Sequence, residues 1–156
     1  MISECFVHIQ LPGSLDVQTA GRFRLDFVEG QPVGRFVYGR RYLADPRAVA
    51  FDPVELLLAP GERRTTALGG IFGALRDAAP DAWGRLLIER RLARADLSEL
   101  DYLLAAPEDR VGALSFSTSP SPATPQDHLP GLDDLVGWMA RADAIQADSA
   151  GDLSPA

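Results

Sequence analysis

Alternation between apolar and polar side chains is the feature that most restricts the fold of this sequence. Every odd position from Cys5 to Leu11 is apolar, and the alternation returns from Arg22 to Phe27. Successive side chains of a β-strand point to opposite faces, so each segment places one apolar face against a core and the other toward solvent. The first sixty residues are therefore expected to form a sheet with one buried face.

Turn signals divide this region into strands. Glu29-Gly30 turns the second strand toward a partner at Arg35–Tyr38, in an antiparallel hairpin whose loop is expected to exceed two residues. Pro53 interrupts the segment 49–58, which fits an edge or irregular strand. Residues 111–116 again have strand character and are expected to join the same sheet.

Helical signals follow in the middle of the chain. A short helix is expected at Gly70–Ala78, and Pro80 separates it from the next helix, for which Asp81 is a candidate N-cap. Ser98 is expected to cap a third helix, which ends at Pro107. The sequence therefore predicts an α+β fold, in which a twisted antiparallel or barrel-like sheet is covered by two to three helices.

Composition changes after residue 118, where a helical appendage is expected. Residues 1–118 are predicted to form the folded domain, 119–131 a Pro/Ser-rich linker, 132–148 an acidic helix and 149–156 a frayed tail. Six aspartates and one arginine beyond residue 118 carry −5 of the net charge of −7. The candidate partner contact is the apolar face of the acidic helix, formed by Leu135, Val136 and Met139.

Composition also restricts the class of function. A net charge of −7 argues against a dedicated nucleic-acid-binding protein, which needs a basic face. One cysteine and two histidines are too few for an internal disulfide or a typical metal cluster. All 15 basic residues are arginine, so no lysine is present to contact nucleotide phosphates. We expect no cofactor and no metal and, with neither a signal peptide nor a membrane span in the sequence, a cytoplasmic protein.

Two motifs carry a resemblance to a known family. The first runs from Ala74 to Arg91, with the sequence ALRDAAPDAWGRLLIERR, and the second from Asp109 to Phe116, with the sequence DRVGALSF. Together they resemble the N-terminal region (N-terminal subdomain 1) of the HipA family of bacterial toxin kinases. Weaker similarity at Phe36–Pro46 and Leu56–Gly61 follows the family's order, so the resemblance covers nearly the whole chain.

The resemblance implies a serine/threonine kinase toxin of a bacterial toxin–antitoxin system, neutralised by a small DNA-binding antitoxin of the HipB type. The family's glycine-rich lysine segment and its kinase core are absent from this chain, so no catalytic residue is carried over. We therefore expect a non-catalytic regulatory and interaction module that contacts a kinase lobe and a HipB-like antitoxin. Two alternatives stay open: a fragment of a full-length active kinase, and a free-standing antitoxin subunit similar to the HipS-like proteins of split systems.

The motif residues are expected to be mainly structural, and they are Asp77, Pro80, Asp81, Trp83, Gly84, Arg85, Asp109, Arg110 and Gly112. Trp83 forms an apolar stripe with Leu86 and Leu87 and is expected to pack against the sheet, with a partner contact as the alternative. Gly112 is expected to permit a close backbone approach or a bulge.

Ion pairs are expected at the junction of the two motifs. Arg85 and Arg110 are predicted to pair with Asp77, Asp81 or Asp109, with a contact to the kinase lobe as the alternative.

Three further positions have a structural and a functional interpretation. His8 is interpreted as a solvated or hydrogen-bonded residue of a strand face rather than a base, and Cys5 as a buried strand residue. Gly69-Gly70 precedes a helix, as in some phosphate-binding turns, but lacks the wider glycine pattern and any lysine.

Overall fold

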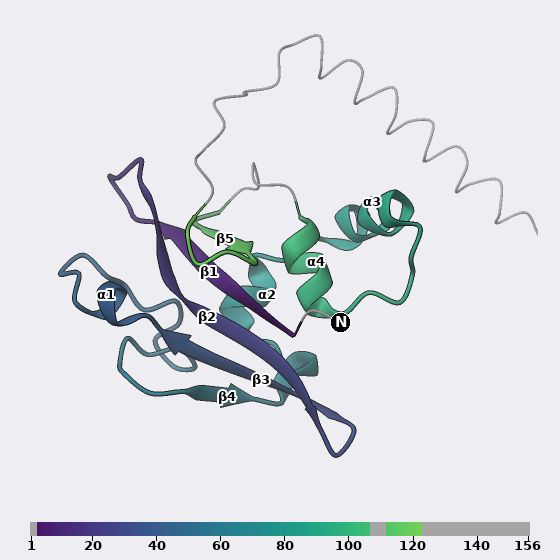
Figure 1. Ribbon diagram of the computed structural model, residues 1–156, viewed down its shortest axis with the longest axis horizontal. Coiled ribbons are helices and arrows are strands. Elements are labelled where there is room, and N and C mark those ends of the chain that lie inside the picture. The colour runs from purple at the N-terminus through teal and green to yellow at the C-terminus, as the bar shows by residue number, and fades with distance from the viewer. Residues whose placement is uncertain (1–2, 107–111, 123–156) are drawn as a thin grey trace, which may run out of the picture. The chain divides into compact units, whose positions relative to one another are not determined.

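The computed structural model describes residues 3–106 and 112–122 (Figure 1). The chain divides into two compact units, 1–124 and 125–156, and every described residue belongs to the first. No helix among the described residues is long and apolar enough to cross a membrane. Several predicted features lie outside the described residues, namely most of the linker, the helix 132–148 with Leu135, Val136 and Met139, the tail 149–156, Asp109 and Arg110.

Five antiparallel strands form one open sheet in the order β4-β3-β2-β1-β5. Their bounds are β1 Glu4–Gln10, β2 Val17–Val28, β3 Gln31–Tyr38, β4 Arg63–Thr65 and β5 Leu114–Ser117. The last strand joins the sheet, as the sequence predicts, and its partner is the first strand, while the short β4 forms the opposite edge. The sheet is twisted and is not closed into a barrel (Figure 1). Together with its helices it makes the predicted α+β fold.

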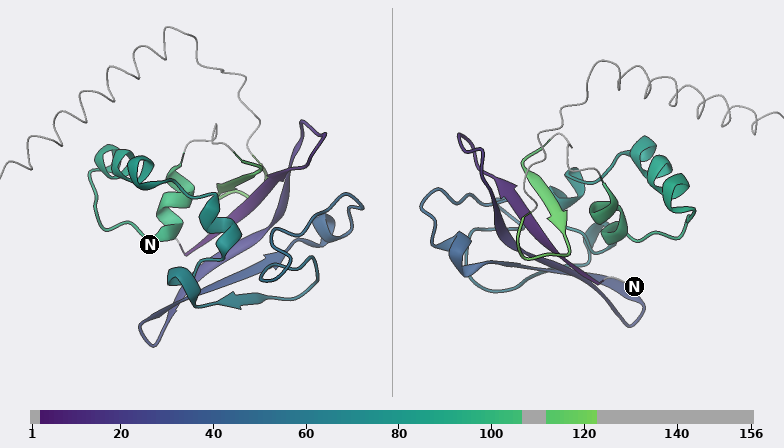
Figure 2. Two further views of the ribbon diagram at one scale, coloured as in Figure 1. Left: turned by 180° about the vertical axis from the view of Figure 1, so that it is seen from behind. Right: turned by 45° about the horizontal axis from the view of Figure 1, so that its top comes forward.

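The alternation of the sequence sets the two faces of this sheet. Cys5 pairs with Phe23, and Phe23 pairs with Phe36, and all three side chains are buried on the inner face. Helices α2 (Gly73–Asp77) and α4 (Glu99–Ala105) cover this face (Figure 2). The fully buried leucines that they add to the core are Leu75, Leu100 and Leu103.

The remaining helical segments are α1 (Arg40–Leu43), the 3₁₀ turn η1 (Ala67–Gly69) and α3 (Ala82–Leu92). The helix expected at 70–78 begins only at Gly73, because Gly70 has a left-handed conformation with φ 81° and Phe72 is extended. The expected helix is therefore shortened at its start.

Both predicted N-caps are confirmed. The Asp81 side chain accepts a hydrogen bond from the backbone N–H of Gly84 at 2.8 Å at the start of α3. Ser98 and Asp101 form a reciprocal capping box at the start of α4. Each cap satisfies backbone N–H groups that have no partner within the helix, which is why these two helices begin where they do.

The β2–β3 hairpin differs from the sequence prediction. Val28 pairs with Gln31, so the loop consists of Glu29 and Gly30 alone and does not exceed two residues. Their φ angles of 53° and 80° fit a type I′ turn, whose twist matches that of the flanking strands. The prediction was wrong because glutamate rarely adopts a positive φ, so a glutamate at this position does not indicate a two-residue turn.

The segment 49–58 is a loop held by two buried tyrosines. It contains an isolated β-bridge instead of the expected edge or irregular strand. The Tyr38 hydroxyl donates to the Leu56 carbonyl at 2.8 Å and accepts from the Phe51 N–H at 2.9 Å. The Tyr42 hydroxyl makes a similar pair of hydrogen bonds earlier in the loop. These side-chain bonds replace the strand-to-strand bonds that a β-ladder would have supplied.

Two glycines let the backbone before α2 pack directly on the sheet. A Cβ atom at Gly34 would lie 1.9 Å from the Gly70 carbonyl oxygen, and one at Gly70 would lie 2.8 Å from Leu25 Cδ1. No side chain fits between the two segments at position 34. This contact fixes how the chain passes from β4 into α2.

We predict that Gly34→Ala lowers the free energy of unfolding by about 2–3 kcal/mol, because the new methyl group forces two backbone segments apart. The matched control is Gly39→Ala, where a Cβ would lie 3.6 Å from its nearest neighbour and φ is −69°. That variant should stay within about 0.5 kcal/mol of the original chain. Urea unfolding of the full chain measures both, and equal stabilities for the two variants would contradict the prediction.

Candidate functional site

Helix α3 carries three of the seven described motif residues, Trp83, Gly84 and Arg85, and lies outside the core. Ile88 is its one buried residue, and it does not belong to the main hydrophobic cluster. The helix contacts α4, which lies between it and the sheet in each view (Figures 1 and 2). The prediction that the apolar stripe of this helix packs against the sheet was therefore wrong.

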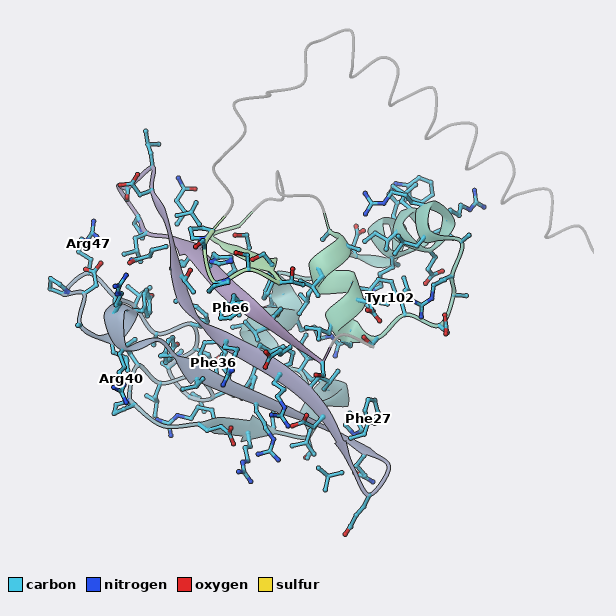
Figure 3. The ribbon with its side chains drawn as sticks, in the orientation of Figure 1. Phe6, Phe27, Phe36, Arg40, Arg47 and Tyr102 are labelled. Atoms are coloured by element: carbon cyan, nitrogen blue, oxygen red, sulfur yellow. The ribbon has the colours of Figure 1, made fainter. Side chains whose placement is uncertain are left out.

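An ion pair joins α3 to α4. The Nη1 and Nη2 groups of Arg85 donate to the two carboxylate oxygens of Glu99, each at 2.8 Å. The guanidinium carbon of Arg85 lies 4.4 Å from the centre of the Tyr102 ring, and its Nε donates to the Pro80 carbonyl at 3.2 Å. The Tyr102 hydroxyl (labelled in Figure 3) donates in turn to Glu89 of α3. The planar guanidinium of Arg85 therefore contacts Pro80, Glu99 and Tyr102 at the same time, and these contacts hold α3 against α4.

The partner of Arg85 differs from the prediction. We expected an acid of the same motif, whereas the pairing residue is Glu99, the first residue of α4. Both side chains are nearly three-quarters buried, with exposed fractions of 27% and 28%. The Arg85 guanidinium holds the pKa of Glu99 below its ordinary value. The cap at Ser98 was predicted from the sequence and places Glu99 in the first helical turn. Which helix Glu99 would face depends on the tertiary fold and could not be predicted.

The opposite side of α3 presents an apolar stripe. At about 3.6 residues per turn, Trp83, Leu86 and Leu87 fall on the side of the helix away from Arg85 and Ile88. Trp83 and Leu86 are half-buried, Leu87 is 36% exposed, and none of the three belongs to the hydrophobic core. A tryptophan beside partly exposed leucines is a composition typical of protein-binding surfaces. We call Trp83, Leu86 and Leu87 the α3 stripe.

The remaining motif residues have local roles. Asp77 is exposed at the end of α2, and Pro80 is half-buried. A Cβ at Gly84 would lie 3.0 Å from Pro80 Cβ, so glycine lets the first turn of α3 pack tightly on the preceding proline. The expected close approach at Gly112 is not found, because no atom lies within 4 Å of a Cβ placed there. Its φ of 142° explains the glycine instead.

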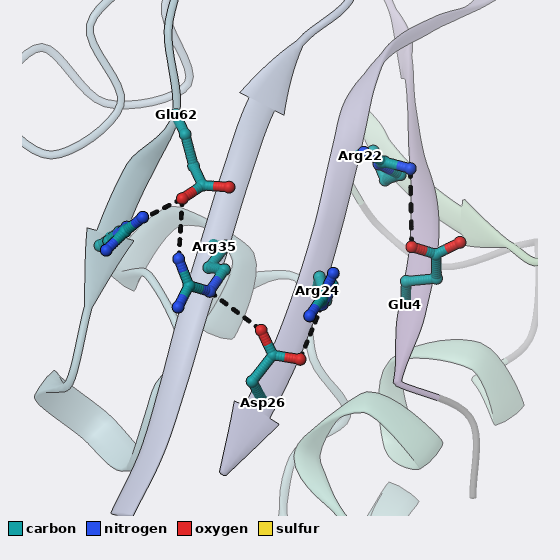
Figure 4. A network of polar contacts seen from close by, with 7 residues as sticks. Glu4, Arg22, Arg24, Asp26, Arg35 and Glu62 are labelled. Atoms are coloured by element: carbon teal, nitrogen blue, oxygen red, sulfur yellow. Dashed lines mark hydrogen bonds and ion pairs between the residues drawn. The ribbon is translucent and has the colours of Figure 1, made fainter. Parts of the chain in front are cut away.

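The outer face of the sheet carries a chain of ion pairs (Figure 4). Asp26 and Glu62 each bridge two arginines, at distances of 2.7 to 2.9 Å. The neighbouring arginines lower the pKa of both carboxyl groups. Four arginines face three carboxylates, so the charges nearly cancel and the face does not attract polyanions. The members of this chain are Arg24, Asp26, Arg35, Glu62 and Arg64, and a separate ion pair on the same face joins Arg22 to Glu4.

Two kinds of reactive centre are not found in the part of the chain that the structure describes. Cys5 is buried, and burial raises the pKa of its thiol to about 12, so the reactive thiolate does not form near neutral pH. Within residues 3–106 and 112–122, no group of three or more histidine, cysteine, aspartate or glutamate side chains could hold a metal ion.

Comparisons with known proteins do not extend this picture. No protein-family model, no curated protein and no solved structure matches the chain. The family resemblance therefore rests on the two sequence motifs, and the functional argument rests on the geometry of α3 and α4.

We predict a coupling energy of about 1–2 kcal/mol between Arg85 and Glu99 at pH 7, because two charge-assisted hydrogen bonds lie in a partly buried junction. A double-mutant cycle with Arg85→Met and Glu99→Gln measures it by urea unfolding. Since the folded-state pKa of Glu99 is lowered, the coupling is complete above the ordinary value of 4.5 and is lost as pH falls through the lowered value. A coupling near zero at pH 7 would show that solvent screens the pair.

Proposed function

We propose that this chain is the non-catalytic N-terminal regulatory and interaction module of a HipA-type serine/threonine kinase, acting in the cytoplasm within a toxin–antitoxin system. The two motifs support the proposal because they occur in the family's order, together with the weaker similarity at Phe36–Pro46 and Leu56–Gly61. The proposed partners are a kinase lobe, on the same chain or a separate one, and a HipB-like antitoxin.

The observation that carries the proposal is that the two sides of α3 have different surroundings. Arg85 and Ile88 hold one side against α4, so the helix has a fixed position. The other side presents the α3 stripe, whose side chains do not enter the core. A rigid helix that leaves Trp83 and Leu87 partly open is suited to dock on another protein surface.

The glycines before α2 support a non-catalytic role. The alternative interpretation of Gly69-Gly70 is a phosphate-binding turn. The backbone N–H groups of Gly70 and Ile71 instead both donate to the Ala67 carbonyl, at 2.8 and 3.2 Å, so they are not free to bind a nucleotide phosphate. The sequence also contains no lysine, the residue that kinases place against the phosphates.

We predict that Leu87→Asp abolishes or strongly weakens binding to the kinase lobe encoded in the same operon, because a buried carboxylate in an apolar contact is costly. The expected loss of affinity is at least about tenfold, or 1.4 kcal/mol. Light scattering and calorimetry on the mixed, purified proteins measure the complex. Leu92→Asp is the matched control, because the Leu92 side chain is similarly exposed but lies on a different side of α3 from Leu87.

Trp83 provides a second arm of the same test. Trp83→Ala should lower stability by about 1–2 kcal/mol, less than the 3–5 kcal/mol typical of a fully buried tryptophan, and should also weaken the complex. Equal binding by the original chain, Leu87→Asp and Trp83→Ala would exclude the α3 stripe as the docking surface. Absence of any complex at tens of micromolar, with both proteins folded, would contradict the module function itself.

We also predict that the chain does not bind ATP. Calorimetry with Mg²⁺ and ATP at up to millimolar concentration should give no binding heat, and a radiolabel transfer assay should show no autophosphorylation. The physical reason is the internally hydrogen-bonded glycine turn together with the absence of lysine. Micromolar ATP binding would overturn the non-catalytic function.

A further inference from the structure

His8 is a buried histidine on the outer face of the sheet. It is 2% exposed and lies between Thr19 of β2 and Ser115 of β5, its cross-strand neighbours. The sequence left solvation and hydrogen bonding open for this residue, and the structure shows a hydrogen-bonded ring. A buried imidazole can change charge near physiological pH, so its partners decide what that change does.

Two hydroxyl groups connect the imidazole to the chain beyond β5. Nδ1 lies 2.9 Å from Thr19 Oγ1, and Nε2 lies 2.8 Å from Ser117 Oγ. The Thr19 hydroxyl donates to the Pro120 carbonyl at 2.6 Å, and the Ser117 hydroxyl donates to the Ser119 carbonyl at 2.8 Å. His8, Thr19 and Ser117, which we call the clasp, thus tie two consecutive carbonyl groups to the sheet.

Hydrogen counting shows that the clasp is sensitive to one proton. Its four contacts need four hydrogens, whereas a neutral imidazole and two hydroxyls supply three. In the neutral form, three of the four contacts are hydrogen-bonded at any one time, so at least one of the two carbonyl groups stays tied to the sheet. A protonated ring fills all four contacts but places a positive charge in a buried site.

Among the described residues, the partners of the His8 ring are neutral groups and do not include a carboxylate. The segment 114–121 contains no ionisable side chain. A buried charge without a partner costs several kcal/mol, more than the one incomplete hydrogen bond of the neutral form. Burial accordingly lowers the pKa of His8, and the hydrogen bond at the Ser119 backbone opposes this only in part. The charged residues on the same face of β1 and β2 are all in ion pairs, and they are Glu4, Arg22, Arg24 and Asp26.

We infer that the clasp is a proton-controlled device, which holds the segment 117–120 on the sheet when His8 is neutral and releases it when His8 is protonated. The closed clasp binds the proton more weakly than an open, hydrated one. It is therefore stable above the ordinary histidine pKa of about 6.5 and weakens as pH falls below that value.

The test is amide hydrogen exchange at Ser119, whose N–H donates to Ser117 Oγ at 3.2 Å. In the full chain, protection of this amide, corrected for its intrinsic exchange rate, should fall about tenfold between pH 7.5 and pH 5. His8→Gln keeps a donor and an acceptor but does not titrate, so its protection should not depend on pH. His128 remains in that variant and controls for titration elsewhere.

Three results would overturn the inference. They are unchanged Ser119 protection between the two pH values, an equal fall in His8→Gln, and an NMR titration midpoint for the His8 ring above 6.5. If His8→Gln does not fold, Thr19→Val replaces it in the test, because the valine removes the Thr19 hydroxyl and keeps the shape of the side chain. It should reduce Ser119 protection at pH 7.5 by at least threefold, about 0.7 kcal/mol, and unchanged protection would also overturn the inference.

Discussion

Burial of one apolar sheet face is the constraint on which the rest of this structure depends. The rings of Phe23 and Phe36 on the sheet meet Phe72 edge to face, with centroids 6.3 and 6.4 Å apart. This cluster requires a cover, and α2 and α4 supply it. The cover is complete without α3, so that helix is fixed by polar contacts to α4 and keeps its own apolar stripe outside the core.

The sequence predicted those features whose cause is local. Strict alternation marked β1 and β2, and the side chains of Asp81 and Ser98 marked the starts of two helices. It did not predict β4, because three polar residues, Arg63–Thr65, carry no apolar alternation and pair only through the tertiary fold. The tight β2–β3 turn was missed for a related reason, since its first residue adopts a backbone conformation that glutamate seldom has.

The candidate site was predicted in its residues but not in its geometry. Trp83, Leu86 and Leu87 were recognised as one stripe, yet the sequence could not say which side of α3 would face the protein. That choice depends on Arg85, which pairs with a carboxylate 14 positions away. Arginine suits this junction because its planar fork meets both oxygens of Glu99 while its face stacks on Tyr102. A lysine could make one of these contacts but not all of them.

The pairing of β5 with β1 also has a kinetic consequence. Phe6 lies opposite Ser117 and Ile9 opposite Leu114, so strands more than a hundred residues apart in the chain are neighbours in the sheet. During synthesis, β1 can pair with β2 early, but its other edge stays open until nearly 120 residues have left the ribosome. Such long-range closure slows folding and leaves a strand edge available for wrong pairings. A nascent chain of this protein therefore passes through a stage in which the apolar strand β1 is paired along one edge only.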